Sequence, residues 1–270
     1  MKPETSTPCS CGSGSGSSCQ GETQKARRGF LGVAAAGLAG IMLAPGVRLI
    51  EVAQAATPGG ANAAATAGAS PKVRWGMLVD TNKCTPGCNA CVSACQTENG
   101  LPVKPGPTDA QWIRKIEIKE VRTGKSHSLP VMCQHCAEPP CVDVCPTGAS
   151  FKRADGIVLV DKHICIGCRY CVMACPYKAR SFIHEPVTNQ KPDVPRGMGT
   201  VEGCTMCVHK VDKGENPACM TACAAAGFGA IAFGDLNDPN SDISKRVAQY
   251  STRQLREDLH LDTGVRYQGL

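Results

Sequence analysis

The sequence has few aromatic residues. Phe, Trp and Tyr make up only 4% of its 270 residues, whereas Gly and Pro contribute 29 and 19 residues. A hydrophobic core built from this composition would be thin, because aromatic side chains supply much of the apolar area that a core buries. The sequence also lacks a Ser/His/Asp arrangement and a Gly-rich phosphate loop, which gives no support to the common hydrolase or nucleotide-binding sites. Other residues must hold the fold and carry the chemistry.

Cysteine is the residue in excess. The chain has 19 Cys, and sixteen of them form four quartets. Four thiolates are the ligand requirement of one 4Fe-4S cluster, so the quartets predict four 4Fe-4S clusters with all sixteen Cys as iron ligands. Such clusters would crosslink distant segments, and folding would depend on loading them. The quartets are Cys84, Cys88, Cys91 and Cys95; Cys133, Cys136, Cys141 and Cys145; Cys165, Cys168, Cys171 and Cys175; and Cys204, Cys207, Cys219 and Cys223.

The third quartet has the spacing C-x2-C-x2-C-x3-C-P and resembles the bacterial two-cluster ferredoxins. In those proteins three cysteines of a run bind one cluster and the fourth, before Pro, binds the other. Pro146 and Pro176 follow quartets two and three, whereas quartets one and four lack this Pro. The resemblance therefore implies an inner pair from quartets two and three and an outer pair from quartets one and four. The implied ligand sets are set A (Cys84, Cys88, Cys91, Cys223), set B (Cys95, Cys204, Cys207, Cys219), set C (Cys133, Cys136, Cys141, Cys175) and set D (Cys145, Cys165, Cys168, Cys171).

Three quartets depart from the ferredoxin spacing. The longer gaps follow Cys84, Cys136 and Cys207, with three, four and eleven intervening residues. Each insertion contains Pro or Gly, so we expect loops that bulge without displacing the ligands. These loops are also places where surfaces for partner proteins could be built.

Zinc is the main alternative metal, because paired cysteines also hold structural zinc. The C-x2-C-x2-C-x3-C-P run argues against zinc, since it places three ligands in one tight turn and sends the fourth to another site. A structural zinc scaffold without redox activity is the competing class of function. The sequence has six His, and the cysteines alone satisfy four clusters. We therefore expect His135 and His209 to form hydrogen bonds near cluster sulfur, where such contacts tune potential, and not to ligate iron.

Residues 1–55 are of a different kind. Arg27 and Arg28 precede an uncharged Ala/Gly-rich run over 29–47, and residues 53–55 have the small-x-small pattern of a cleavage site. The segment resembles a twin-arginine signal peptide, which exports folded proteins and implies a periplasmic body. A transmembrane anchor over the same run is the alternative, since roughly 20 apolar residues span a bilayer.

Three further cysteines, Cys9, Cys11 and Cys19, lie before the arginines in a Gly/Ser-rich stretch. We interpret this stretch as part of a discarded leader. The formal net charge of +6 does not indicate nucleic-acid binding, because thiolate-ligated clusters add negative charge.

The body of the chain predicts short elements between the quartets. Strands are expected over 74–80, over the alternating and half-buried run 113–121, and over 129–132. Asp155-Gly156 predicts a hairpin that joins strands 149–152 and 157–160. After a strand at 230–233, we expect a helix that Ser241 or Asp242 caps and that runs toward Tyr250, and then a short helix over 252–259. Residues 261–270 show no clear period and predict a surface arm.

The predicted fold class is α+β, with two intertwined bacterial-ferredoxin-like modules of two clusters each, β-hairpin insertions and a short helical C-terminal arm. The expected organisation is a signal peptide over 1–55, a flexible linker over 56–72, a four-cluster domain over 73–235 and a C-terminal arm over 236–270. Within the four-cluster domain, the inner module covers about 130–185 and the outer module about 73–129 plus 186–235.

The four-quartet order from Trp75 to about Phe233 resembles the four-cluster iron–sulfur subunits of molybdopterin oxidoreductases and related membrane complexes. Four segments resemble, more narrowly, the DsrO family of periplasmic iron–sulfur subunits, which serve membrane complexes of dissimilatory sulfite reduction or sulfur oxidation. They are R-W-G-M-L-V-D at 74–80, the run at 145–171 from C-P-T-G-A-S to C-I-G-C-R-Y-C, F-G-D-L-N-D-P at 233–239 and T-G-V-R-Y-Q-G-L at 263–270.

This resemblance implies an electron-transfer subunit that is not itself catalytic. Its implied neighbours are a polytopic quinone-interacting membrane subunit and a periplasmic multihaem cytochrome c, with no molybdenum subunit and no nucleic acid. It would relay single electrons through the four clusters in sulfite or sulfur metabolism. The alternative is an electron-transfer subunit of a molybdopterin reductase.

Overall fold

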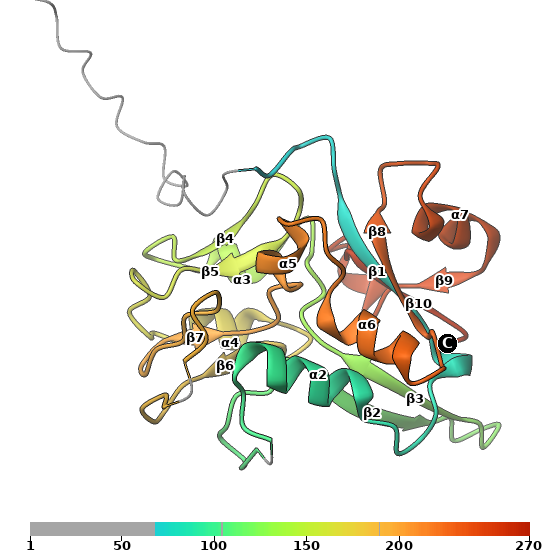
Figure 1. The fold of residues 1–270 in the computed structure, drawn as a ribbon, viewed down its shortest axis with the longest axis horizontal. Helices are drawn as coiled ribbons and strands as arrows, with labels where there is room; N and C mark the ends of the chain where they lie inside the picture. Colours follow the sequence, from blue (N-terminus) through green and yellow to red (C-terminus); the bar gives the residue numbers. More distant parts are fainter. Residues whose placement is uncertain (1–67, 104, 189) are drawn as a thin grey trace, which may run out of the picture. The chain divides into compact units, whose positions relative to one another are not determined.

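A computed structural model describes residues 68–103, 105–188 and 190–270 (Figure 1). The expected signal peptide, its cysteines and most of the linker lie outside the described residues. The described chain mixes short helices with short strands, which confirms the α+β class.

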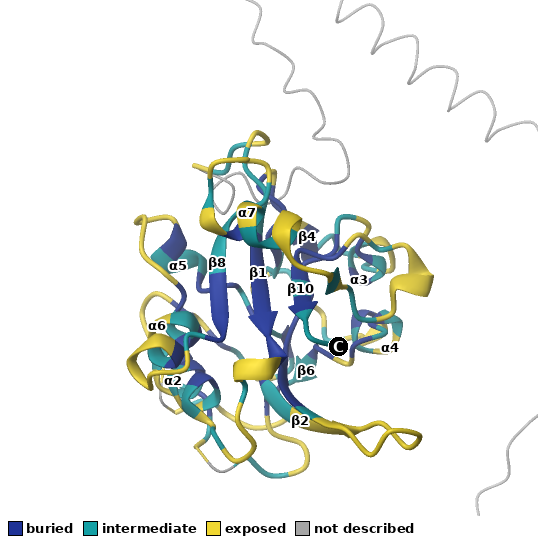
Figure 2. Ribbon diagram, turned by 90° about the vertical axis from the view of Figure 1, so that its right-hand side faces the viewer, coloured by how far each residue is buried: buried dark blue, intermediate teal, exposed yellow. Residues whose placement is uncertain are grey.

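In a four-stranded sheet in the order β8-β1-β10-β9, the two middle strands are more buried than the two outer ones (Figure 2). Its strands are β1 (Trp75–Asp80), β8 (Ile231–Asp235), β9 (Thr252–Arg253) and β10 (Val265–Gln268). β1 lies between β8, with which it pairs antiparallel, and β10, with which it pairs parallel. Both faces of β1 are buried. Leu78 packs with Ala232 and Ile243 on one face, whereas Met77 and Val79 belong to the main core on the other.

The C-terminal segment is not a surface arm. The expected arm over 261–270 is wrong, because β10 lies inside the sheet and both Val265 and Tyr267 are fully buried. The Tyr267 hydroxyl donates to the Pro130 carbonyl over 3.1 Å and accepts from the Gln134 amide over 3.3 Å. The helix expected over 252–259 is also wrong. That segment contains β9, which pairs with β10, and only one 3-10 turn, η2 (Glu257–Leu259).

The helix expected after Ser241 is present. α7 (Asp242–Gln249) begins where the Ser241 hydroxyl accepts a hydrogen bond from the backbone amide of Ser244 over 3.2 Å. This is the usual role of Ser at a helix N-cap, where it satisfies an otherwise unpaired amide. α7 covers one face of the sheet through Ile243, which is fully buried.

Three hairpins extend from this core. They are β2 (Arg114–Lys119) with β3 (Ser126–Val131), β4 (Ser150–Lys152) with β5 (Val158–Val160), and β6 (Ser181–Phe182) with β7 (Val201–Glu202). The second is the predicted Asp155-Gly156 hairpin. The expectation of a half-buried strand at 113–121 is wrong for Ile116 and Ile118, which are 37% and 41% exposed. β2 pairs only with β3 in a two-stranded ribbon, and no other strand of the described chain covers these two side chains (Figure 2).

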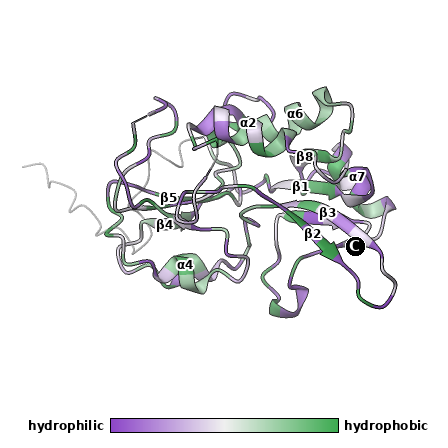
Figure 3. Cartoon of the chain, turned by 90° about the horizontal axis from the view of Figure 1, so that it is seen from below, coloured by the Kyte–Doolittle hydropathy of each residue, from purple (hydrophilic) through white to green (hydrophobic). Residues whose placement is uncertain are grey.

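Four helices carry quartet cysteines, and they pack in two pairs. α2 (Ala90–Asn99) of the first quartet packs against α6 (Ala218–Ala225) of the fourth, and α3 (Pro140–Asp143) of the second packs against α4 (Tyr170–Ala174) of the third. The 3-10 helix η1 (Thr81–Lys83) precedes the first quartet and α5 (Val208–Val211) follows Cys207. In Figure 3, α4, β4 and β5 lie toward one end of the described chain, α6 and the sheet lie toward the other, and α2 lies near the middle.

Candidate metal centres

Cysteines of α2 and α6 line two separate cavities. Cys91 lines one cavity with Cys84, Cys88 and Cys223, which are all the members of set A. Cys95, four residues further along α2, lines a second cavity with the other members of set B. Residues four apart on a helix lie one above the other on one face, so one helix serves both cavities. The structure therefore brings together the thiols of set A and, separately, those of set B.

Charge interactions group the remaining thiols. Burial raises the pKa of Cys136 to about 12, and its thiol neighbours are Cys133, Cys141 and Cys175, the other members of set C. Burial also raises the pKa of Cys171, whose neighbours include Cys145 and Cys165 of set D. Cys168, the fourth member of set D, lies at the surface three residues after Cys165. The ligand role of these sixteen thiols is a prediction from the sequence.

Burial divides the four sets into two kinds. All eight thiols of sets B and C are buried. In set A, Cys84 and Cys88 are only partly buried, and in set D the same holds for Cys145 and Cys165, whereas Cys168 is exposed. Sets A and D therefore reach the surface, and sets B and C do not.

Thiols of different sets that lie near one another give the order of the sets. Cys91 of set A lies near Cys219 in set B. Cys133 of set C is a neighbour of Cys204 in set B, and Cys141 of set C is a neighbour of Cys171 in set D. The order along the molecule is A, B, C, D. The two pairs are nested in the sequence but follow one another in space.

Hydrogen-bond donors point at thiol sulfur in every set. Such donors favour the thiolate over the thiol and tune the potential of a metal that the sulfur binds. The contacts are Ala230 N to Cys223 Sγ at 3.3 Å, Met206 N to Cys204 Sγ at 3.4 Å, Asn99 Nδ2 to Cys95 Sγ at 3.5 Å, Arg180 Nη2 to Cys141 Sγ at 3.2 Å, Ser150 N to Cys145 Sγ at 3.3 Å and Val201 N to Cys165 Sγ at 3.5 Å.

Basic side chains accompany the thiols. Arg180 is 6% exposed and lies beside Cys141. Lys115 donates to the carbonyls of Thr85 and Cys88 over 2.9 and 2.8 Å and lies beside the Cys84 thiol. A buried cation is costly without a counter-charge, and iron-bound thiolates would supply it. The donor set therefore fits thiolate-bound clusters. The sequence reasoning missed both residues because nothing in the cysteine spacing marks them.

The two histidines make contacts other than those expected. The ring Nδ1 of His135 accepts a hydrogen bond from the backbone amide of Val158 over 3.0 Å, and burial lowers the pKa of His135 to about 3, which keeps the ring neutral. Its backbone amide, and not its ring, bonds the Cys133 thiol. The ring of His209 lies 2.7 Å from Glu98 Oε1. The ring contacts described for both residues are therefore to protein N and O atoms, not to sulfur.

The described residues show no group of three or more His, Cys, Asp or Glu that could hold a single metal ion. None of the sixteen quartet cysteines, all of which lie in the described part of the chain, forms a disulfide. In sets A and B they surround a cavity instead of meeting at one point.

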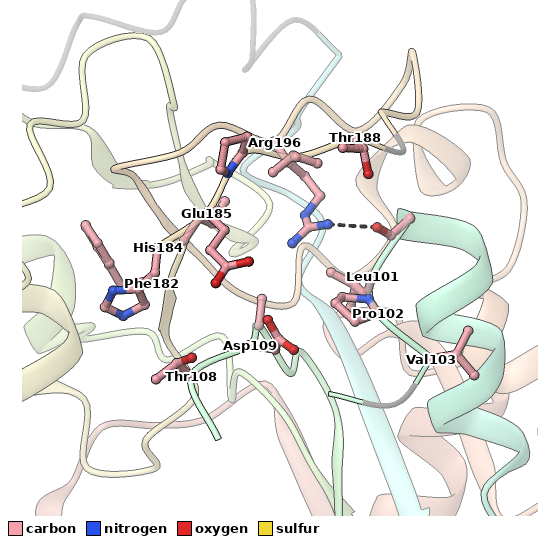
Figure 4. Close-up of a pocket in the computed structure, with 15 residues that line it drawn as sticks. Leu101, Pro102, Val103, Thr108, Asp109, Phe182, His184, Glu185, Thr188 and Arg196 are labelled. Carbon is pink, nitrogen blue, oxygen red and sulfur yellow. Dashed lines mark hydrogen bonds between the residues drawn. The ribbon is translucent and has the colours of Figure 1, made fainter. Parts of the chain in front are cut away.

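A further cavity lies apart from the thiols and opens to solvent (Figure 4). Residues 100–103, 108–110 and 182–188 contribute to its described lining, together with Arg196, and no cysteine is among them. Arg196 closes one wall by donating from Nη1 to the Gly100 carbonyl over 2.7 Å, as Figure 4 shows. The carboxylates of Asp109 and Glu185 also belong to the lining.

Comparison with known proteins agrees with this geometry. Residues 83–149 and 125–236 each match a family described as a 4Fe-4S dicluster domain. The chain is 44% identical over 225 residues to iron–sulfur subunit 1 of the Hdr-like menaquinol oxidoreductase of Archaeoglobus fulgidus, an alignment that covers 73% of this chain and 83% of that protein. The chain belongs to this family of iron–sulfur subunits.

Two other relatives are similar over a comparable length. The protein NrfC of Escherichia coli is 42% identical over 182 residues, which are 67% of this chain and 74% of NrfC. A sulfite dehydrogenase subunit of Allochromatium vinosum is 35% identical over 198 residues, which are 66% of this chain and 76% of that protein. The chain is an electron-transfer subunit that carries four 4Fe-4S clusters. In the part of the chain that the structure describes, no helix has the length and apolar character needed to span a membrane.

Proposed function

We propose that sets A, B, C and D each bind one 4Fe-4S cluster and that the four form a single path for electrons through the chain. Such clusters supply one-electron transfer at potentials of roughly −700 to +450 mV. The protein holds them in order, keeps water from the middle of the path and leaves its two ends accessible. The domain that does this spans about 73–270, because β9 and β10 belong to its sheet.

One observation carries this proposal. The eight thiols of the two middle sets are all buried, whereas both end sets contain thiols that reach the surface. A redox partner can approach a cluster closely only where the cluster lies near the surface. Electrons would therefore enter and leave the chain at sets A and D. A structural zinc scaffold would have no need for this difference between the middle sets and the ends.

Spin coupling tests the order. In the fully reduced protein, neighbouring paramagnetic clusters split each other's electron paramagnetic resonance signals. Cys219→Ser removes a set B ligand and should abolish the splitting between A and B and between B and C. Cys168→Ser removes a set D ligand. Of the three clusters that remain, only that of set C should lose a splitting. Loss of splitting between A and B in the Cys168→Ser protein would contradict the linear order.

A second variant tests the crossing of ligands. Cys175 belongs to the third quartet in sequence, and its proposed assignment to set C is supported by its position near Cys136. Cys175→Ser should disturb the cluster of set C and leave Cys165, Cys168 and Cys171 bound to theirs. A loss confined to set D would show that the crossed assignment is wrong.

The partners follow from the kind of relatives. We propose a quinone-interacting membrane subunit at one end and a periplasmic multihaem cytochrome c at the other, in sulfite or sulfur metabolism. The relatives named for a menaquinol oxidoreductase and a sulfite dehydrogenase support this choice. Purification of the complex from membranes tests it. A haem protein and a membrane subunit should accompany the chain, and recovery of a pterin subunit would favour the molybdopterin reductase alternative.

The location also belongs to the proposal. Residues 1–55 would act as a twin-arginine signal, with 56–72 as a linker, and the folded domain would function in the periplasm. Replacing both Arg27 and Arg28 by Lys should leave the precursor in the cytoplasm. Fractionation of cells that carry the loaded protein measures this, and continued export of the double variant would argue against the twin-arginine route.

A further inference from the structure

Arg180 lies between the thiols of two sets. It immediately precedes β6, and its side chain is buried, with 6% of the residue exposed. Its Nη2 donates to Cys141 Sγ over 3.2 Å and to Ser150 Oγ over 3.0 Å. Cys133, also of set C, and Cys171 of set D are further charged neighbours. The guanidinium of Arg180 therefore lies beside thiols of both set C and set D.

The charge of Arg180 is compensated differently from that of two other buried arginines. Arg153 forms ion pairs with Asp155 and Asp212, and Arg196 forms one with Glu202. The described hydrogen bonds of the Arg180 side chain go to the Cys141 thiol and the Ser150 hydroxyl, and neither partner is a carboxylate. In the loaded protein, iron-bound thiolate would supply the counter-charge for this guanidinium.

Ser150 fixes the position of Arg180. Ser150 is 1% exposed at the start of β4, and its hydroxyl accepts the hydrogen bond from Nη2. Its own backbone amide donates to Cys145 Sγ over 3.3 Å. One residue thus touches a set D thiol through its backbone and orients the guanidinium beside a set C thiol through its side chain.

We propose that Arg180 is a positioning residue that raises the midpoint potentials of the clusters held by sets C and D. Reduction adds one negative charge to a group that is already negative, and a fixed positive charge beside the sulfur stabilises the reduced form more than the oxidised form. The low-dielectric interior strengthens this effect. The inference rests on the ligand sets proposed above, and it makes sets C and D better electron acceptors than their thiolates alone would.

Potentiometric titration of the loaded protein, followed by electron paramagnetic resonance, tests the role of Arg180. Arg180→Gln removes the charge but keeps a hydrogen-bond donor, and it should lower the potentials of two clusters while the other two keep theirs. Arg180→Lys keeps the charge but cannot reproduce the planar fork, so it should lower the same two potentials by less. Four unchanged potentials in an Arg180→Gln protein with full iron content would overturn the proposal.

Arg153→Gln is the matched control. It also replaces a buried arginine, but one whose partners are carboxylates, so it should reduce stability and leave all four potentials unchanged. If Arg180→Gln fails to retain iron, Arg180→Met decides, because it removes the charge and keeps an unbranched side chain: potentials equal to those of the unmodified protein would reject the role. Iron and sulfide contents of the unmodified protein test the four-cluster proposal separately, so its failure is distinguishable from a failure of the Arg180 inference.

Discussion

Cys91 and Cys95 lie one turn apart on α2, and their thiols face different cavities. α6 repeats this arrangement, because Cys219 lines the cavity of set B and Cys223 that of set A. Each cavity therefore takes thiols from both helices. A pair of helices of ten and eight residues is sufficient to position half of the members of two sets.

Single substitutions on α2 should separate the two sets. We expect Cys91→Ser to disturb only the cluster of set A and Cys95→Ser only that of set B. Iron content together with electron paramagnetic resonance identifies which signal is lost. If the two variants lose the same signal, Cys91 and Cys95 bind one cluster and the crossed assignment of α2 fails.

Gly167 allows the set D loop to close. Its φ of +70° lies in the left-handed region, and a Cβ there would collide with the Gly199 carbonyl. Gly167→Ala should therefore cost more than the roughly 1–2 kcal/mol of the left-handed conformation alone, and it should weaken the set D cluster first.

Gly148→Ala is the control for this variant, because Gly148 has a similar φ of +67° but open space around a Cβ. It should show the conformational cost without the collision. Thermal unfolding under anaerobic conditions and the iron content measure both effects. Equal losses in the two variants would mean that the Gly199 contact has no influence.

Tyr267 links the last strand to the β3 hairpin. Tyr267→Phe keeps the buried ring but leaves the Pro130 carbonyl without its 3.1 Å hydrogen bond. An unsatisfied buried acceptor costs about 1–3 kcal/mol, so we expect a lower free energy of unfolding with full cluster content. Chemical denaturation under anaerobic conditions measures it. Stability equal to that of the unmodified protein would show that water or a rearranged Gln134 replaces the bond.

Removal of the clusters should unfold the domain. The buried core contains eleven of the sixteen quartet thiols and few aromatic rings, and without iron the crosslinks between the segments that carry those thiols would be lost. An anaerobic iron chelator should abolish the near-ultraviolet circular dichroism and the cooperative thermal transition. Iron and sulfide should restore both. An iron-free protein that still unfolds cooperatively at the same temperature would contradict this dependence.

Local sequence signals gave the correct elements where one short segment decides the structure. The Asp155-Gly156 turn and the Ser241 cap need only their own neighbours, and both are present. The pairing of the runs is a prediction that the sequence allows, because Pro146 and Pro176 mark which runs resemble a ferredoxin pair. The order of the four sets could not be predicted, since it depends on the proximity of Cys133 and Cys204, which no local pattern encodes.

The failures have the same origin. Val265 and Tyr267 alternate with polar residues over only four positions, which is too short to distinguish a buried strand from an irregular end. Ile116 and Ile118 show a clear alternation but lie on a ribbon that no other strand covers. Arg180 carries no motif, and its importance follows only from the thiols that the fold places around it.

The parallel pairing of β1 with β10 joins residues from the two ends of the described chain. During synthesis β1 leaves the ribosome well before β10, so the central sheet cannot close until residues 265–268 have been made. A chain that stops between Cys223 and Val265 would contain every cysteine of the four quartets and an open β1 edge. Closure of the sheet therefore requires residues that lie beyond the last quartet cysteine.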